Sequence, residues 1–183
     1  MNVMSRFVVV PVVALAIVLG VSSCSLTPGS PVVAASQPAA QTVTYTSPDF
    51  GYSVDFGGTA VESSVPQSVG GYNLVIKIAS WTGGDRVQTV SALKFPDGLI
   101  STVNDALLTA SLEGAATSSQ GTLSDQKFID VDGERGASGT VTVSSGVVRV
   151  VVFFHDGAQF TISTVNGSQD QQDSLVGSFV FGA

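Results

Sequence analysis

His155 is the only histidine of the chain, and this count limits the acid–base chemistry that the sequence can perform. It excludes a zinc site built from several histidines and the HExxH motif of metallopeptidases. A Ser–His–Asp triad would have to use His155, but the chain has no Gly-x-Ser-x-Gly elbow to present a nucleophile. The stretch FFHDG places His155 at the expected end of a strand, before a tight turn. We therefore predict that His155 packs partly on a sheet, assign no catalytic residue, and expect no enzyme.

Three carboxylates alternate in the segment DVDGE (130–134) and could approach a cation. A calcium loop of the EF-hand type also needs oxygen ligands at later positions and a bidentate Glu at position 12, and these are absent here. Asp132-Gly133 is instead typical of a turn between two strands. We predict that the chain binds no metal and no cofactor.

The segment WTGGDR (81–86) combines a large aromatic side chain with two glycines and one charge of each sign. Gly83-Gly84 lacks the Lys-Ser/Thr pair of a phosphate-binding loop. Two interpretations remain. Trp81, Asp85 and Arg86 could form a hairpin tip that contacts a ligand or partner, because Trp and Arg are enriched at binding hot spots. Alternatively, Trp81 packs at the edge of the sheet, and this interpretation is favoured.

Cys24 is the only cysteine, and it follows an uncharged apolar run at residues 7–21. A membrane-spanning helix needs roughly 20 apolar residues, so this shorter run, preceded by Arg6, is typical of a signal peptide. The sequence VSSC (21–24) resembles a bacterial lipobox, in which small residues precede a cysteine that receives a diacylglycerol. We predict cleavage before Cys24, acylation of Cys24 with fatty acids such as palmitate, and anchoring on the extracytoplasmic face of the cell membrane.

The composition divides the chain into three parts: a signal peptide (1–23), a lipidated Cys24 with a flexible tether (24–41), and one domain (42–183). The tether contains three prolines and no charge, as expected for a flexible or polyproline-like spacer. Loss of Arg6 with the signal peptide leaves six Lys and Arg against 14 Asp and Glu, a net charge of −8. This acidic surface argues against nucleic-acid binding, which needs clustered positive charge.

Period-two alternation and turn residues predict a domain rich in strands. The expected strands are 42–46, 52–56, 74–81, 87–95, 123–131, 138–143, 147–155 and 158–165. Residues 99–116 have helical periodicity, with Ile100, Val103, Leu107 and Ala110 on one stripe. A second helix is expected after Ser168, which can form a capping box with Gln171. The predicted fold class is α+β, an antiparallel sheet flanked by helices, and the alternative is a pure β-sandwich.

Two segments resemble a known family. DFGYSVDFGG (49–58) is similar to the opening hairpin of PsbP-like domains, in particular of the LpqN-type lipoproteins of mycobacteria and related actinobacteria. AQFTISTVNGSQDQQDSLVGSFVF (158–181) is similar to the closing strand and helix of that family. The family often has proline where this chain has Gly57-Gly58. The resemblance implies a three-layer α-β-α sandwich and an accessory or binding module without enzymatic activity.

Three functional classes follow from these observations. The leading hypothesis is a non-catalytic envelope lipoprotein whose domain binds a protein, or assists an assembly, at the outer face of the membrane. The second is a carrier of a lipid or another apolar ligand, which would need a cavity above about 300 Å³ between sheet and helices. A hydrolase ranks last, because no residue pair stands out as nucleophile and base.

Overall fold

The computed structural model describes residues 42–100 and 102–182. The predicted signal peptide, Cys24 and the tether lie outside these residues. The described elements are, in chain order, β1 (Val43–Thr46), β2 (Tyr52–Phe56), β3 (Val61–Val69), β4 (Tyr72–Gly83), β5 (Arg86–Lys94), α1 (Asp105–Ser118), β6 (Thr122–Val131), β7 (Glu134–Val143), β8 (Gly146–His155), β9 (Ala158–Val165), α2 (Gln169–Gly177) and β10 (Val180–Phe181).

Seven strands form one antiparallel sheet in the order β3-β4-β5-β9-β8-β7-β6. Two-residue turns join β6 to β7 and β8 to β9. Their residues, Asp132-Gly133 and Asp156-Gly157, all have positive φ. Such turns match the twist of the flanking strands. Both were predicted as turns, and both predictions are confirmed. β8 is an interior strand with both faces covered, as its nearly continuous apolar sequence indicated.

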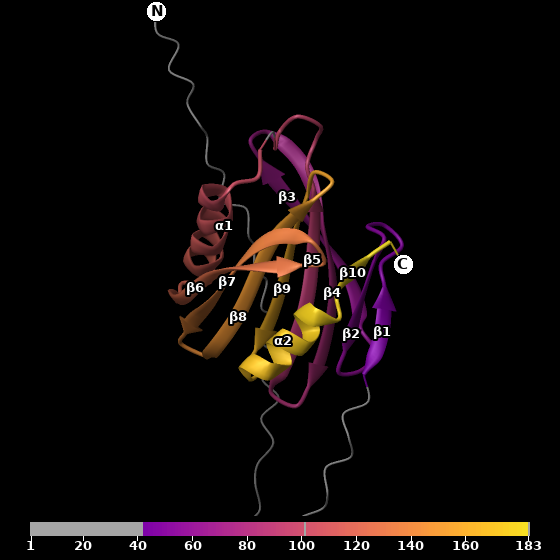
Figure 1. Ribbon diagram of the computed structural model, residues 1–183, viewed down its shortest axis with the longest axis vertical. Helices are drawn as coiled ribbons and strands as arrows, with labels where there is room; N and C mark the ends of the chain where they lie inside the picture. The colour runs from indigo at the N-terminus through magenta and orange to yellow at the C-terminus, as the bar shows by residue number, and fades with distance from the viewer. Residues whose placement is uncertain (1–41, 101, 183) are drawn as a thin grey trace, which may run out of the picture.

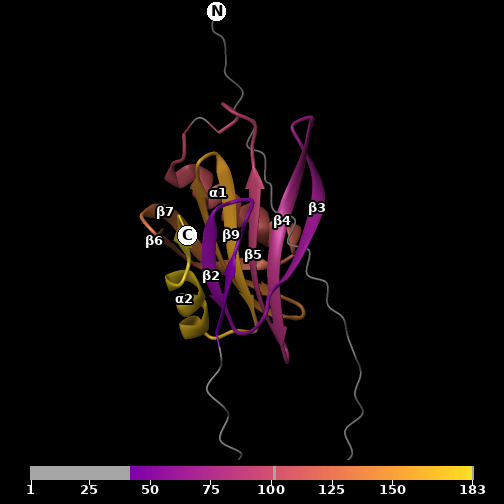
Figure 2. The same cartoon turned by 90° about the vertical axis from the view of Figure 1, so that its right-hand side faces the viewer.

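A second, three-stranded sheet is formed by the two ends of the domain. β2 is its central strand, with β1 on one side and the short β10 on the other. This small sheet and α2 pack against one face of the large sheet, whereas α1 packs against the opposite face. Figure 1 shows the strand order, and in Figure 2 β2 and α2 stand in front of the large sheet with α1 behind it. The predicted α+β class is confirmed, and α1 excludes the pure β-sandwich.

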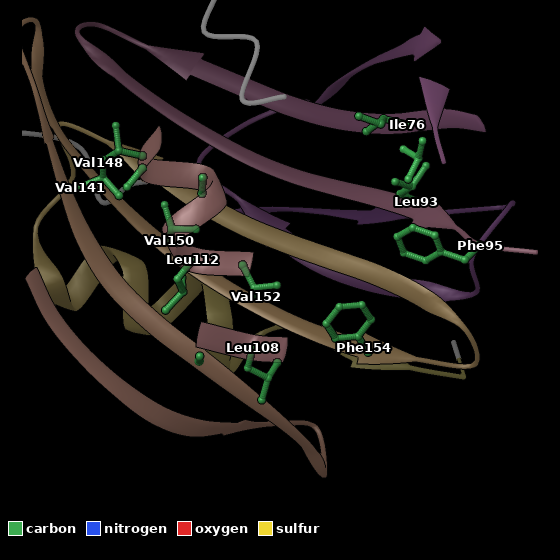
Figure 3. Packing of buried hydrophobic residues seen from close by; sticks show 14 of the residues in the cluster. Ile76, Leu93, Phe95, Leu108, Leu112, Val141, Val148, Val150, Val152 and Phe154 are labelled. Carbon is green, nitrogen blue, oxygen red and sulfur yellow. The ribbon is translucent and has the colours of Figure 1, made fainter. Parts of the chain in front are cut away.

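α1 begins later than the predicted helix, and its buried face is different. Asn104 caps the helix, because its side-chain oxygen accepts a hydrogen bond from the Leu107 amide at 2.9 Å. Ile100 and Val103 therefore precede the helix, and Val103 is exposed. The predicted stripe was wrong at Val103, because it combined loop residues with helical ones, whereas Ile100 and Leu107 are partly buried against the core. The face that packs on β6, β7 and β8 carries Leu108 and Leu112, as Figure 3 shows.

β3 was not predicted, because its sequence VESSVPQSV is polar and contains a proline. The strand lies at the edge of the sheet, where proline is tolerated. A two-residue turn at Gly70-Gly71 makes Val69 and Tyr72 a hydrogen-bonded pair, and such pairs alternate along the ladder. The nitrogen of Pro66 therefore points to the free edge, where it has no hydrogen to offer an added strand.

α2 has the capping box that the sequence predicted, with Ser168 and Gln171 bonded to each other's backbone amides. The helix ends at Gly177, and the chain then passes through buried Phe179 into β10. In the part of the chain that the structure describes, both helices are too short to cross a membrane.

Candidate functional site

An open cleft of about 590 Å³ lies at one end of the large sheet. It is bounded by the turn between β1 and β2, by the turn between β8 and β9, and by the end of β10. The first turn is held in shape by two hydrogen bonds of the Ser47 backbone, one of them from the Gly51 amide at 3.1 Å. Gly51 has a φ of +62°, which favours glycine, and its carbonyl accepts a bond from the Gly182 amide at 2.9 Å. The two ends of the described domain therefore meet at the cleft.

The floor of the cleft is aromatic. Phe160 meets Phe50 edge to face with ring centroids 5.8 Å apart, and it meets Phe181 in the same way at 5.3 Å. Phe181 is fixed from two sides, because its ring stacks on His155 at 3.8 Å and its amide donates to the Asp132 carboxylate at 2.7 Å. A rigid apolar surface of this kind contributes binding area without a large loss of side-chain entropy.

The rim of the cleft carries charges that have local partners. Lys77 pairs with Asp49 at 3.0 Å, and both side chains are about half exposed. The ammonium group of Lys94 donates to the carbonyl oxygen of Asp156. The cleft thus presents an apolar floor inside a rim with donors and acceptors of both signs, and it has no excess of positive charge among its lining residues.

His155 lies at the strand end, as predicted, and both of its ring nitrogens face carboxylates. Nδ1 is 2.8 Å from an oxygen of Glu134, and Nε2 is 3.4 Å from an oxygen of Asp156. An imidazole acts as the base of a triad only if one nitrogen is free to receive a proton from the nucleophile. Among the described residues, the hydrogen bond to Glu134 and the stacking on the Phe181 ring are the close contacts of His155.

The three carboxylates of DVDGE have three separate roles. Asp130 accepts a hydrogen bond from the Gly133 amide at 3.0 Å and so stabilises the turn. Asp132 holds the Phe181 amide, and Glu134 bonds to His155. Within 42–100 and 102–182, no group of three His, Cys, Asp or Glu side chains is arranged to hold a metal ion. Metal binding itself stays a prediction for experiment.

Trp81 lies in β4, two residues before the hairpin tip, and is partly buried. Its ring lies directly over the backbone of Gly57, Gly58 and Gly83, where a Cβ atom at any of these positions would overlap it. This packing explains why the chain has Gly57-Gly58 after β2. Arg86 stands 5.7 Å above the same ring.

Asp85 is exposed at the tip between β4 and β5, and its carbonyl accepts a hydrogen bond from the side chain of Asn166 at 3.1 Å. The tip lies at the opposite end of β5 from Lys94, and therefore from the cleft. The residues of the predicted contact loop thus do not line the cleft. Their role in partner binding stays a prediction, as does the lipidation of Cys24, which lies outside the described residues.

Two tyrosines at the β1–β2 hairpin are held in their neutral form. Burial raises the pKa of Tyr45 to about 12, and the hydrogen bond to Glu62 adds to this effect. Burial likewise raises the pKa of Tyr52, which is almost fully enclosed beside Phe160 and Phe179. Tyr45 donates to the Glu62 carboxylate at 2.7 Å and so ties β1 to β3.

Sequence reasoning missed the cleft. The residues that form it, among them Phe50, Lys77, Lys94 and Phe181, come from five separate segments. The one available signal was the clustering of aromatic residues at both ends of the domain, in DFGY (49–52) and FVF (179–181).

A seven-stranded antiparallel sheet with one helix on each face, and a small sheet formed by the chain ends, defines a PsbP-like α+β fold. The solution structure of cyanobacterial PsbP (CyanoP) from Synechocystis sp. PCC 6803 has this fold, with a TM-score of 0.51 and 17% sequence identity. The similarity covers 84% of this chain and 98% of CyanoP. No protein-family model and no curated protein matches the chain. The likeness establishes the fold and transfers no functional residue.

Proposed function

We propose that the chain is an envelope lipoprotein, anchored through Cys24, whose PsbP-like domain binds a protein partner through the cleft beside Phe181. The observation that supports this proposal most directly is the aromatic floor of the cleft within a rim of mixed polarity. Aromatic residues at the centre and polar groups at the rim are the composition typical of protein interfaces.

The rim favours a polypeptide over an anionic headgroup. Lys77 and Lys94 already contact Asp49 and the Asp156 carbonyl, so an anion would have to displace an internal partner. A polypeptide supplies both donors and acceptors and can pair with Lys and Asp groups side by side. The cleft volume of about 590 Å³ is enough for a few side chains of a partner.

The position of the cleft also fits a tethered binding module. Val43 pairs with Phe56 at one end of β2, and Thr46 pairs with Ser53 near the other end, where the cleft opens. The chain therefore enters the domain at the end opposite to the cleft, as β1 in Figure 1 shows. A domain carried on residues 25–41 would then present the cleft away from its anchor, toward a partner in the envelope.

The alternative function, carriage of a lipid, requires a closed apolar cavity. The pocket between α2 and the large sheet measures about 130 Å³ and has walls of mixed polarity, and this is less than half of the volume that such a ligand needs. The cleft is larger but open to solvent, so an acyl chain lying in it would keep one side in water. These volumes favour the protein partner.

Two exposed valines on neighbouring strands offer a matched test. Val75 lines the cleft and is 48% exposed, whereas Val61 is 68% exposed on β3 and does not line it. We expect Val75→Asp in the full-length lipoprotein to reduce recovery of its partner from native membranes at least tenfold. Val61→Asp should leave recovery unchanged, and both variants should melt close to the parent.

The same pull-down separates the competing surfaces when proteins and extracted lipids are identified by mass spectrometry. A partner that is lost with Asp85→Lys and retained with Val75→Asp would move the binding site to the β4–β5 tip and contradict the proposal. A stoichiometric lipid that disappears with Val75→Asp, with no protein lost, would establish the carrier instead.

The anchor has a separate test. Cys24→Ala should leave the chain without a lipid and with an uncleaved signal peptide. Palmitate labelling should then detect no acyl group on the variant. A cleaved and labelled Cys24→Ala chain would disprove lipidation at this residue and would leave the cleft proposal untouched.

A further inference from the structure

A second pocket, of about 230 Å³, lies between the β1–β2 hairpin and strands β3 and β4. Tyr45 lines it from the hairpin, and Glu62 and Ser64 line it from β3. Asp49 and Lys77 line both this pocket and the cleft beside Phe181. The two hollows therefore adjoin each other, and these two side chains stand between them.

The ion pair between Lys77 and Asp49 is the partition. Its nitrogen and oxygen are 3.0 Å apart, and the side chains are 46% and 54% exposed. An exposed ion pair of this kind contributes little to stability, because water solvates both charges when the pair is broken. A ligand that brings a replacement charge can therefore open it. The cleft and the second pocket then form one continuous hollow, which we call the extended groove.

Strand β4 forms the floor of the extended groove. Side chains alternate along a strand, so Val75, Lys77 and Ala79 lie in a row on one face of β4. Val75 lines the cleft, Ala79 lines the second pocket, and Lys77 lines both. Four steps along a strand cover about 13 Å. This length suits an extended polypeptide of about five residues, in which every second side chain faces the groove.

The two halves of the extended groove differ in charge. The cleft has its aromatic floor, whereas the lining of the second pocket has the carboxylates of Asp49 and Glu62 against the one ammonium group of Lys77. Both carboxylates lie near the phenol of Tyr45. Burial is the largest cause of the raised pKa of Tyr45, and the nearby charges of Glu62 and Asp49 add to it. The second pocket therefore favours a positively charged group.

Glu62 is accessible to such a group. It is exposed, and its carboxylate accepts a hydrogen bond from the uncharged hydroxyl of Tyr45 at 2.7 Å. Among residues 42–100 and 102–182, no Lys, Arg or His side chain forms an ion pair with it. Its oxygens can accept further bonds, so a basic side chain can pair with Glu62 without displacing an internal cation.

We propose that the extended groove binds an extended segment of the partner that carries an apolar side chain and, four residues away, a lysine or arginine. The apolar side chain lies on the aromatic floor of the cleft. The basic side chain enters the second pocket, pairs with Glu62 and displaces Lys77 from Asp49. This inference rests on the proposed function, because it specifies the partner of the same cleft.

The probes are labelled peptides with the core Phe-Thr-Val-Thr-Lys or its reverse, Lys-Thr-Val-Thr-Phe, flanked by Gly-Ser. In an extended chain the side chains of Phe, Val and Lys all point to one side. Binding to the full-length chain in detergent is measured by fluorescence anisotropy. We expect the tighter of the two Lys peptides to bind at least tenfold more tightly than the same peptide with Glu in place of Lys.

Two variants break the same ion pair and should act in opposite directions. Lys77→Met removes the competing cation and should tighten binding of the Lys peptide at least threefold. Asp49→Asn removes a carboxylate that the ligand needs and should weaken binding at least threefold. Glu62→Gln, which can still accept from Tyr45, should also weaken it.

Glu113→Gln is the control for the loss of one negative charge. Glu113 is exposed on α1 and does not line the extended groove, so this variant should bind as the parent does. All four substituted residues are at or near the surface, and each variant should melt close to the parent.

Three results would overturn the inference: no binding of either Lys peptide at millimolar concentration, equal binding of the Lys and Glu peptides, or a shift in the same direction for Lys77→Met and Asp49→Asn. The pull-down with Val75→Asp separates this failure from that of the proposed function. If the partner is lost with Val75→Asp while Lys and Glu peptides bind equally, the cleft stands and the extended groove is wrong. If the partner is retained with Val75→Asp, the cleft itself is wrong.

Discussion

The two faces of the seven-stranded sheet are built from different residues and from different parts of the chain. The face under α1 is mostly aliphatic, with Leu108 and Leu112 packed on valines of β7 and β8, and its buried aromatic residues are Phe95 and Phe154. The opposite face is aromatic, with Phe153, Phe160 and Phe179 in mutual contact. One helix from the middle of the chain covers the first face, whereas both ends of the domain cover the second. The open cleft belongs to the aromatic face, so the face covered by the two ends of the domain also carries the proposed binding surface.

The comparison predicts its largest effect at Phe153, which is fully buried and stacks on Phe160 with centroids 5.3 Å apart. Phe153→Ala should lower the free energy of unfolding by about 4 kcal/mol, because it loses both buried area and ring contacts. Chemical denaturation measures this change. A loss below about 2 kcal/mol would show that the aromatic layer repacks easily and is not the rigid face described here.

The aliphatic face should respond less strongly. Leu112 is 1% exposed in the middle of α1, and Leu112→Ala should cost about 3 kcal/mol. Val103→Ala is the control for the corrected helix face, because Val103 is exposed ahead of the helix and should change stability by less than about 0.5 kcal/mol. If the two variants were equally destabilising, the first predicted stripe would be right and the structural assignment of the buried face wrong.

The two faces of the sheet show what the sequence could predict and what it could not. The continuous apolar run of β8 and the alternation along β9 predicted that Phe153 and Phe160 lie in strands, because both patterns are properties of the local sequence. The capping box at Ser168 was equally local. The face of α1 was mispredicted because the N-cap at Asn104 moves the start of the helix, and four apolar residues spaced across that boundary imitate a longer stripe.

The cleft and β3 could not be derived for a different reason. β3 is polar, and its pairing with β4 depends on the hairpin at Gly70-Gly71 rather than on its own residue pattern. The cleft requires Phe50 and Phe181, from opposite ends of the domain, to pack on the same Phe160 ring, and no local pattern specifies that arrangement. Gly57-Gly58 was noticed as a departure from the family, but its cause, the Trp81 ring, comes from another hairpin.

Alkaline pH should loosen the aromatic face selectively. Burial raises the pKa of Tyr52 above its ordinary value of 10.0, so folding favours the neutral phenol. The stabilisation is complete below pH 10 and is lost as the pH rises toward the pKa of the folded state. Denaturation between pH 8 and 11 should show this loss, and Tyr52→Phe should reduce it. Tyr72→Phe, at an exposed residue of β4, should not, and an equal effect of both variants would contradict the assignment.

Acid pH should affect the other face, with the smallest change. Arg135 on β7 donates to Asp105 in the first turn of α1 at 2.7 and 3.0 Å, and this bond holds the pKa of Asp105 below its ordinary value. Its stabilisation is present above the ordinary pKa and is lost as the pH falls through the lowered one. Asp105→Asn should therefore reduce the acid dependence of melting slightly.

Asp170→Asn controls for this effect, since Asp170 also lies in the first turn of its helix, one position further from the N-cap than Asp105. Both substitutions remove a negative charge near a helix N-terminus, so their difference isolates the bond to Arg135. An identical acid profile for the two variants would show that the helix dipole, and not the contact with β7, accounts for the effect.

The central place of β2 between β1 and β10 has a consequence for how the molecule is made. A polypeptide that leaves a ribosome or a translocation pore starting with its N-terminus exposes β1 and β2 first, but the aromatic layer stays open on one side until Val180 pairs with Ser53. Tyr52 and Phe56 therefore lack their final neighbours while more than 100 further residues emerge. Closure of the layer therefore has to wait for β10, and any factor that protects the emerging chain must shield the β1–β2 hairpin until that strand is available.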